Sequence, residues 1–289
     1  MISPFVFALL SPFTSALINI FDKYVLSHKV KHPLSFTAMA GIASLCLGIV
    51  LALFLDWTGI SWRSILPATG SAVFFALWTY LYYFTFSQAD ASHVQGIVFT
   101  YPLLVALLSF VFLNERISMM GYFAVILILI GVFLLSQRIK KSGAPLQLWM
   151  LGIMIGCGAG AEFLIKIATT NLPTAHSISI NGIVIGLLLL PAFLHRHARR
   201  EFIDEFRNMG WAFFNSFGSL LALLWIYTAM IYLPATIASS LSATQPLFVV
   251  FLERIAHVWV GKMTQDEAIL PKLRAILFIV IGVVLLYMS

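Results

Sequence analysis

The sequence predicts an all-α integral membrane protein with ten transmembrane helices, arranged as two five-helix inverted repeats. Three observations predict this fold. The 289 residues are 61% hydrophobic and 10% charged, whereas soluble domains carry about 25% charged residues. The apolar runs reach the length of about 20 residues that a helix needs to cross a bilayer. Finally, distant stretches of the chain resemble each other at a nearly constant offset.

Charges and turn residues divide the chain into apolar runs of membrane-spanning length. Continuous runs such as FAVILILIGVFLL favour helices, because barrel strands alternate apolar and polar side chains over about ten residues. The opening MISPFVFALLSPF lacks the basic start of a signal peptide, so we interpret it as part of the first helix. The predicted helices span 4–26, 33–55, 66–88, 92–113, 117–136, 148–169, 173–194, 209–231, 234–255 and 273–288.

The loops between these helices are too short to hold a soluble catalytic domain. Both cysteines, Cys46 and Cys157, fall inside predicted helices, where packing is a more ordinary role than a disulfide or a metal site. The sequence contains no HExxH, GxSxG, P-loop or paired-cysteine metal motif. We therefore expect that the protein is not an enzyme and that it binds neither a metal nor a cofactor.

Basic residues are distributed unevenly among the loops. Thirteen Lys and Arg lie in loops that follow odd-numbered helices, against only Arg63 and Arg116 on the opposite side. The net charge of +6 therefore reflects topology and not nucleic-acid binding, and the HRHARR run is a topology signal or a lipid-headgroup contact. Both termini are expected outside the cell. The loops expected in the cytoplasm are 27–32, 137–147, 195–208 and 256–272.

The chain repeats itself in order. TFSQADASHVQGIVFTYPLL (85–104) resembles AMIYLPATIASSLSATQPLF (229–248) at an offset of 144. IGVFLLS from Ile130 resembles IGVVLLY from Ile281 at an offset of 151. We therefore predict a first repeat over 1–141 and a second over 146–289.

Each repeat holds five predicted helices, and five is odd, so the second repeat must cross the membrane in the opposite direction. Two such halves can exchange conformations and expose one site, near the bilayer midplane, alternately to each side. This pattern predicts transport by alternating access. The alternative is that duplication of the five helices only produced a larger helix bundle that does not transport, as in a membrane sensor or scaffold.

The stretch YPLLVALLSFVFLNERISMMGYFAVILILIGVFLLS (101–136) has a proline early in one span, a glutamate in a short turn and a glycine-containing apolar span. It resembles the EamA-like branch of the drug/metabolite transporter superfamily. The resemblance implies ten helices around a central cavity, a small-metabolite, amino-acid, nucleotide-sugar or toxic-compound substrate, and export across a bacterial inner membrane. The chain departs from the family in two respects. The second half has no clean match to Glu115, and family termini are usually cytoplasmic.

Two charges stand inside the predicted helix 148–169. Glu162 and Lys166 are four residues apart and share a helix face. A charge at the bilayer centre costs at least about 2.5–3.5 kcal/mol, so neither side chain should face lipid. One interpretation is a neutralising pair that fixes the helix. The other is a site at which Glu162 couples transport to protons, because burial disfavours its charge and the lysine favours it.

The first half carries counterparts of both residues. At an offset of 143, Asn19 aligns with Glu162 and Lys23 with Lys166. The two lysines would suit an anionic substrate, whereas Glu162 would suit a proton or a cationic one, and the pattern does not choose between them. Asp22 is interpreted as neutralising Lys23 near the membrane boundary.

Aromatic and polar residues form a second candidate set. Aromatic side chains would line a cavity for organic cations or planar solutes, or form an interfacial belt. The paired prolines are either packing kinks or gating bends. Glu115 and Arg116 favour capping or structural pairing, and His176, Asn181 and Asn215 favour structural hydrogen bonds. The candidates for substrate contact or gating are Tyr80, Tyr83, Tyr101, Trp225, Tyr227, Gln245, Pro102 and Pro246.

The predicted function is therefore a secondary transporter, with a small-molecule substrate, the lipid bilayer as its partner and proton coupling as one option. The alternative is a flippase or exporter of a lipid-linked or amphipathic substrate. The oligomeric state stays open.

Overall fold

A computed structural model describes residues 3–29, 33–86, 98–136, 148–194, 202, 206–260 and 269–288. All regular elements in these ranges are helices, as predicted. The helices of the first part of the chain are α1 (Pro4–His28), α2 (Pro33–Leu53), α3 (Trp62–Phe86), α5 (Tyr101–Phe112) and α6 (Met119–Ser136). Those of the second part are α7 (Leu148–Ala168), α8 (Thr174–Leu189), α10 (Met209–Tyr232), α11 (Ala235–Ser242), α12 (Gln245–Val260) and α13 (Ile269–Met288), with short 3-10 turns η1 (Leu190–Leu194) and η2 (Phe206–Asn208).

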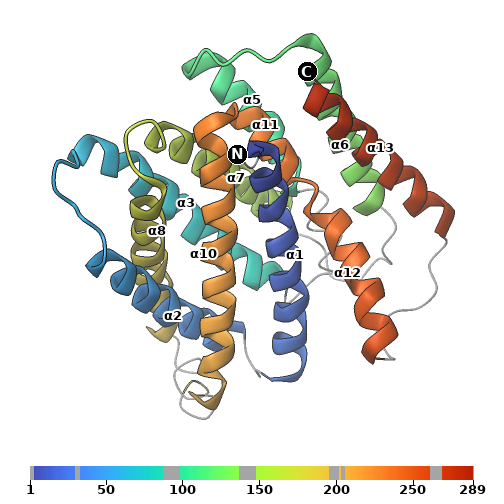
Figure 1. Cartoon of the computed structure of the whole chain (residues 1–289). Coiled ribbons are helices and arrows are strands. Elements are labelled where there is room, and N and C mark those ends of the chain that lie inside the picture. The colour runs from blue at the N-terminus through green and yellow to red at the C-terminus, as the bar shows by residue number, and fades with distance from the viewer. Residues whose placement is uncertain are drawn as a thin grey trace.

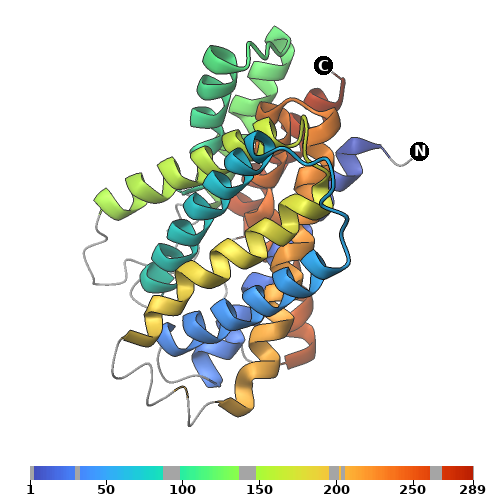
Figure 2. The same ribbon diagram turned by 90° about the vertical axis from the view of Figure 1, so that its left-hand side faces the viewer.

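Seven helices in the described ranges have the length and apolar composition needed to cross a membrane. Three further apolar helices are shorter: Tyr101–Phe112, Met119–Leu134 and Arg274–Met288. Each predicted span coincides with described helix, although the first residues of the predicted span 92–113 lie outside the described residues. The chain is an integral membrane protein by these criteria, and Figures 1 and 2 place both ends of the described chain at the same end of the bundle.

Two predicted helices are interrupted in the structure. The span 92–113 contains a turn at Phe99 and Thr100, and a second span is interrupted in the same way. The span 234–255 is two helices, α11 and α12, separated by a turn at Ala243 and Thr244. Pro246 explains the interruption, because proline has no N–H to donate to the carbonyl of Ser242, four residues earlier, where α11 ends.

The main helix contacts join the first part of the chain to the second. α6 packs on α13, α2 on α8, α3 on α7 and α1 on α10, and Figure 1 shows α1 beside α10 and α6 beside α13. Residues 3–136 and 148–288 are therefore interleaved and do not form two separate bodies.

The contact between α6 and α13 depends on two glycines. A Cβ on Gly131 would lie 2.8 Å from the backbone oxygen of Ala275, and a Cβ on Gly282 would lie 2.9 Å from that of Ala124. Such distances are shorter than carbon and oxygen tolerate, so any larger residue would separate the helices. Gly131 and Gly282 stand at the same offset of 151 that relates the two sequence motifs.

Candidate functional site

Two helix breaks stand at corresponding positions of the sequence repeat. Val98 is helical, Phe99 and Thr100 form a turn, and α5 then begins at Tyr101. In the second half, Ala243 and Thr244 form the turn that precedes α12.

The same type of backbone hydrogen bond occurs at both breaks. The N–H of Leu103 donates to the carbonyl of Thr100 at 3.1 Å, and that of Leu247 donates to Thr244 at 2.9 Å. Pro102 and Pro246 accordingly lie in the first turns of new helices and do not bend continuous ones.

The first break places a tyrosine against the buried glutamate of α7. The hydroxyl of Tyr101 donates a 2.6 Å hydrogen bond to Oε1 of Glu162, and the two residues are 6% and 7% exposed. Gly158 leaves space for the ring, since a Cβ there would lie 3.3 Å from Cγ of Tyr101. Oε2 of Glu162 has no hydrogen-bond partner among the described residues.

Further polar side chains gather around this pair. Tyr227 lies close to Glu162, and it also lies near Ser71 and Asn181. Ser242 lies next to the phenol of Tyr101. We call Ser71, Tyr101, Glu162, Asn181, Tyr227 and Ser242 the central polar cluster; they come from α3, α5, α7, α8, α10 and α11.

The central polar cluster is unusual because much of it lacks partners. Within the described structure, hydrogen bonds of ordinary geometry are missing for Ser71 Oγ, Asn181 Oδ1, the Tyr227 hydroxyl and Ser242 Oγ, as well as for Oε2 of Glu162. Most buried polar atoms in proteins are paired, and unpaired ones call for an explanation such as function. Six helices therefore bring buried polar side chains together in the interior of the bundle.

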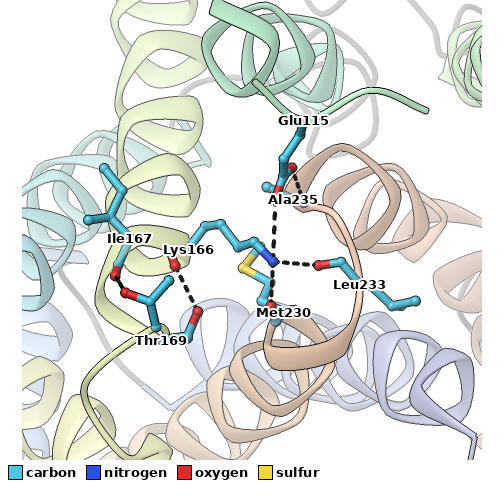
Figure 3. Close-up of polar contacts among 8 residues, drawn as sticks. Glu115, Lys166, Ile167, Thr169, Met230, Leu233 and Ala235 are labelled. Carbon is cyan, nitrogen blue, oxygen red and sulfur yellow. Dashed lines mark hydrogen bonds and ion pairs between the residues drawn. The ribbon is translucent and has the colours of Figure 1, made fainter. Parts of the chain in front are cut away.

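The partners of Lys166 are residues other than Glu162, and Figure 3 shows its ammonium reaching Glu115, Met230 and Leu233. Its ammonium donates to the carbonyls of Met230 at 2.7 Å and Leu233 at 2.8 Å, and it lies 3.4 Å from Oε1 of Glu115. The interpretation of a neutralising pair on one helix face is thus wrong. Lys166 reaches the turn between α10 and α11, while Glu162 is engaged with α5.

Glu115 completes this contact. Its Oε2 accepts a 2.8 Å hydrogen bond from the N–H of Ala235, the first residue of α11. A carboxylate at a helix N-terminus satisfies an unpaired N–H and interacts favourably with the helix dipole. The predicted capping and pairing role of Glu115 is confirmed, and we call Glu115, Lys166 and Ala235 the terminal clasp.

Asn19, the first-half counterpart of Glu162, lies outside the central polar cluster. Oδ1 of Asn19 accepts a 2.8 Å hydrogen bond from the hydroxyl of Tyr82. Asp22 is 4% exposed and accepts a hydrogen bond from Nδ2 of Asn215, so it is buried among the helices of the bundle. The side chain of Lys23 lies outside the described residues.

The aromatic candidates do not form one wall. Tyr80 is 41% exposed, whereas Tyr101 and Tyr227 are buried. Trp225 stacks on Phe7 with ring centroids 5.7 Å apart. Tyr227 is buried in the central polar cluster, Gln245 is partly buried at the start of α12, and the side chain of Tyr83 lies outside the described residues.

His176 and its neighbours stabilise the connection between α2 and α3. Its Nε2 lies 2.9 Å from the carbonyl oxygen of Asp56, and its ring packs edge-on against Trp57 at 4.7 Å. The backbone N–H of Thr58 donates to the Asp56 carboxylate at 2.9 Å and lowers the pKa of Asp56 below its ordinary value. The predicted structural role of His176 is confirmed.

Comparisons with known proteins agree with this architecture. The model of the EamA-like transporter family, part of the drug/metabolite transporter superfamily, matches residues 2–137, which confirms the resemblance noted in the sequence. Among solved structures, 28 chains match. One crystal structure has a TM-score of 0.68 at 15% identity, over 96% of this chain and 95% of its own, which shows a shared fold. No curated protein matches the chain.

Proposed function

We propose, from the membership of residues 2–137 in the EamA-like transporter family, that this chain is a secondary transporter of small metabolites, amino acids or toxic organic compounds. Members of that family are transporters and not enzymes. The proposed mechanism is alternating access around the central polar cluster, with export across a bacterial inner membrane.

The pairing of helices supports two inverted repeats, residues 1–141 and 146–289. If each helix of the first half corresponds to one of the second, α6 pairs with its equivalent α13, and α2 with α8. The pairs α3 with α7 and α1 with α10 are likewise equivalent to each other. A two-fold relation between inverted halves predicts this set of contacts, and the reciprocal approach of Gly131 and Gly282 obeys it as well.

The observation that carries the proposal is the meeting of Tyr101 with Glu162 at a break in a membrane helix. Discontinuous helices at equivalent positions of inverted repeats are where transporters bind solutes near the bilayer midplane. Here the break before α5 brings Tyr101 to the buried carboxylate at 2.6 Å. An ionisable side chain buried within a membrane bundle is in general a functional residue.

The terminal clasp supports a closed state at one end of the bundle. It connects the turn after α5, the end of α7 and the start of α11 through a single ammonium and a single carboxylate. Opening the central polar cluster toward that end requires separating these three segments. The clasp is therefore proposed as the contact that breaks when the transporter changes its open side.

The proposal is tested by reconstituting the full chain into liposomes and measuring uptake from a pooled metabolite extract by mass spectrometry. Uptake of one or more soluble compounds above that of protein-free liposomes is expected. A sensor or scaffold would move none. A flippase would move only lipid-linked or amphipathic compounds, and either outcome contradicts the proposal.

A further inference from the structure

The described bundle interior holds more acidic than basic side chains. Asp22 and Glu162 are buried carboxyl residues, and neither has a basic partner among the described side chains. Among the described Lys and Arg side chains, Lys166 is the only one that is not exposed, since Lys29, Arg63, Arg116 and Arg274 are exposed.

The charge of Lys166 is already satisfied. A lysine ammonium has three N–H donors, and Met230, Leu233 and Glu115 lie at 2.7, 2.8 and 3.4 Å from Nζ. Glu115 also balances the charge of Lys166. Lys166 is therefore a poor ligand for an anionic solute.

The unpaired atoms of the central polar cluster are acceptors or adaptable hydroxyls. Oε2 of Glu162 can only accept when the carboxyl is ionised. Asn181 already donates its amide to the carbonyl of Ser177 at 2.9 Å, and the atom left unpaired is its acceptor Oδ1. Ser71, Tyr227 and Ser242 contribute hydroxyls, which rotate to accept or to donate. A ligand rich in N–H donors matches this set.

We infer, on the basis of the proposed transport function, that the central polar cluster binds the ammonium group of an organic cation. Oε2 of Glu162 is the counter-ion, and Asn181 and the hydroxyls of Tyr227 and Ser71 accept the remaining N–H donors. The side chains of Tyr101 and Tyr227 both lie close to Glu162, and aromatic rings attract cations. This assignment selects the cationic solute from the two classes that the sequence leaves open.

The test uses four probes of similar size: benzylamine, benzyltrimethylammonium, benzyl alcohol and benzoate. Binding is measured on the purified full chain in lipid nanodiscs as a saturable rise in the midpoint of thermal unfolding, since a ligand of the folded state stabilises it. We expect benzylamine to bind and benzoate and benzyl alcohol not to bind. Benzyltrimethylammonium, which has no N–H, should bind about tenfold more weakly, as expected for lost hydrogen bonds.

Two substitutions assign the binding to the cluster. Glu162→Gln keeps an oxygen that can accept from Tyr101 but removes the charge, and should weaken benzylamine binding about 10- to 100-fold. Tyr227→Phe keeps the charge and should weaken binding less. Asp56→Asn, which neutralises the exposed carboxylate in the connection between α2 and α3, is the matched control and should bind as the wild type does.

The inference is overturned if benzoate binds as tightly as benzylamine, or if Glu162→Gln binds benzylamine as the wild type does. It is also overturned if benzylamine does not bind while flux driven by a pH gradient depends on Glu162, because the carboxyl then serves protons alone. If benzylamine binds through Glu162 but no solute crosses the liposome membrane, the inference stands and the transport function is wrong.

Discussion

The hydroxyl of Tyr101 and the carboxylate of Glu162 are joined by a 2.6 Å hydrogen bond across 61 positions of the chain. Tyr101 occupies this place because it is the first residue of α5, directly after the turn at Phe99 and Thr100. A change at this break would move the phenol relative to α7. The bond therefore couples the backbone of a broken helix to the buried carboxyl of the proposed binding site.

Tyr101→Phe removes the one hydrogen bond that Glu162 accepts from the described residues. Leaving a buried polar group unpaired costs about 1–3 kcal/mol, so we expect about a tenfold or larger fall in solute flux. The full-length variant is assayed in liposomes at matched protein content. Tyr80→Phe removes the same hydroxyl from an exposed position and should leave flux unchanged. Equal losses in both variants would contradict the role of Tyr101.

The terminal clasp predicts coupling between Glu115 and Lys166. Glu115→Gln keeps an acceptor for Ala235 but removes the charge, and Lys166→Met removes the ammonium from the carbonyls of Met230 and Leu233. Each should lower the midpoint of thermal unfolding. A double-mutant cycle should give an interaction energy of about 1 kcal/mol, because both side chains are partly exposed, at 15% and 16%. Strictly additive effects would show that the pair is not coupled.

The close approach of α6 and α13 predicts that Gly131→Ala and Gly282→Ala destabilise the protein. In each, the added Cβ would lie under 3 Å from the backbone oxygen of the facing helix, and overpacking of this kind costs about 1–3 kcal/mol. Thermal unfolding in detergent measures the effect. Gly152→Ala is the matched control, since nothing lies within 4 Å of its Cβ position. A control that unfolds as early as the other two would refute the packing explanation.

The charge distribution predicts a topology in which residues 27–32 and 195–208 are cytoplasmic and both termini are outside. The test starts from a variant with Cys46 and Cys157 replaced by serine. Arg63→Cys should then react with a membrane-impermeant maleimide in intact cells, and Arg199→Cys only after permeabilisation. The reverse labelling pattern would show that both termini are cytoplasmic, which is the orientation usual in the family.

The helices were predictable because long apolar runs, bounded by charges and turn residues, favour helices of membrane-spanning length. The break at Ala243 and Thr244 was not, although both prolines and their correspondence were visible in the sequence. A proline in an apolar run is compatible with a kink, a break or the first turn of a helix. Only the hydrogen bonds of the surrounding backbone decide among these.

Some residues of the central polar cluster were predicted from the sequence, but their contacts were not. Glu162, Tyr101 and Tyr227 do meet, whereas the expected contact between Glu162 and Lys166 is absent. A spacing of four residues places two side chains on one face of a helix, but long side chains can reach partners on neighbouring helices instead of each other. Ser71 and Ser242 were missed entirely, because an isolated serine in an apolar helix carries no sequence signal of its own.

The most direct test of the account is solute flux with and without a pH gradient in liposomes holding wild type, Glu162→Gln or Asp56→Asn. We predict that wild type and Asp56→Asn move solute faster with the gradient, and that Glu162→Gln loses this dependence, because it removes the one charge of the central polar cluster. Gradient-dependent flux of equal size in all three proteins would show that Glu162 is structural and that the coupling site lies elsewhere.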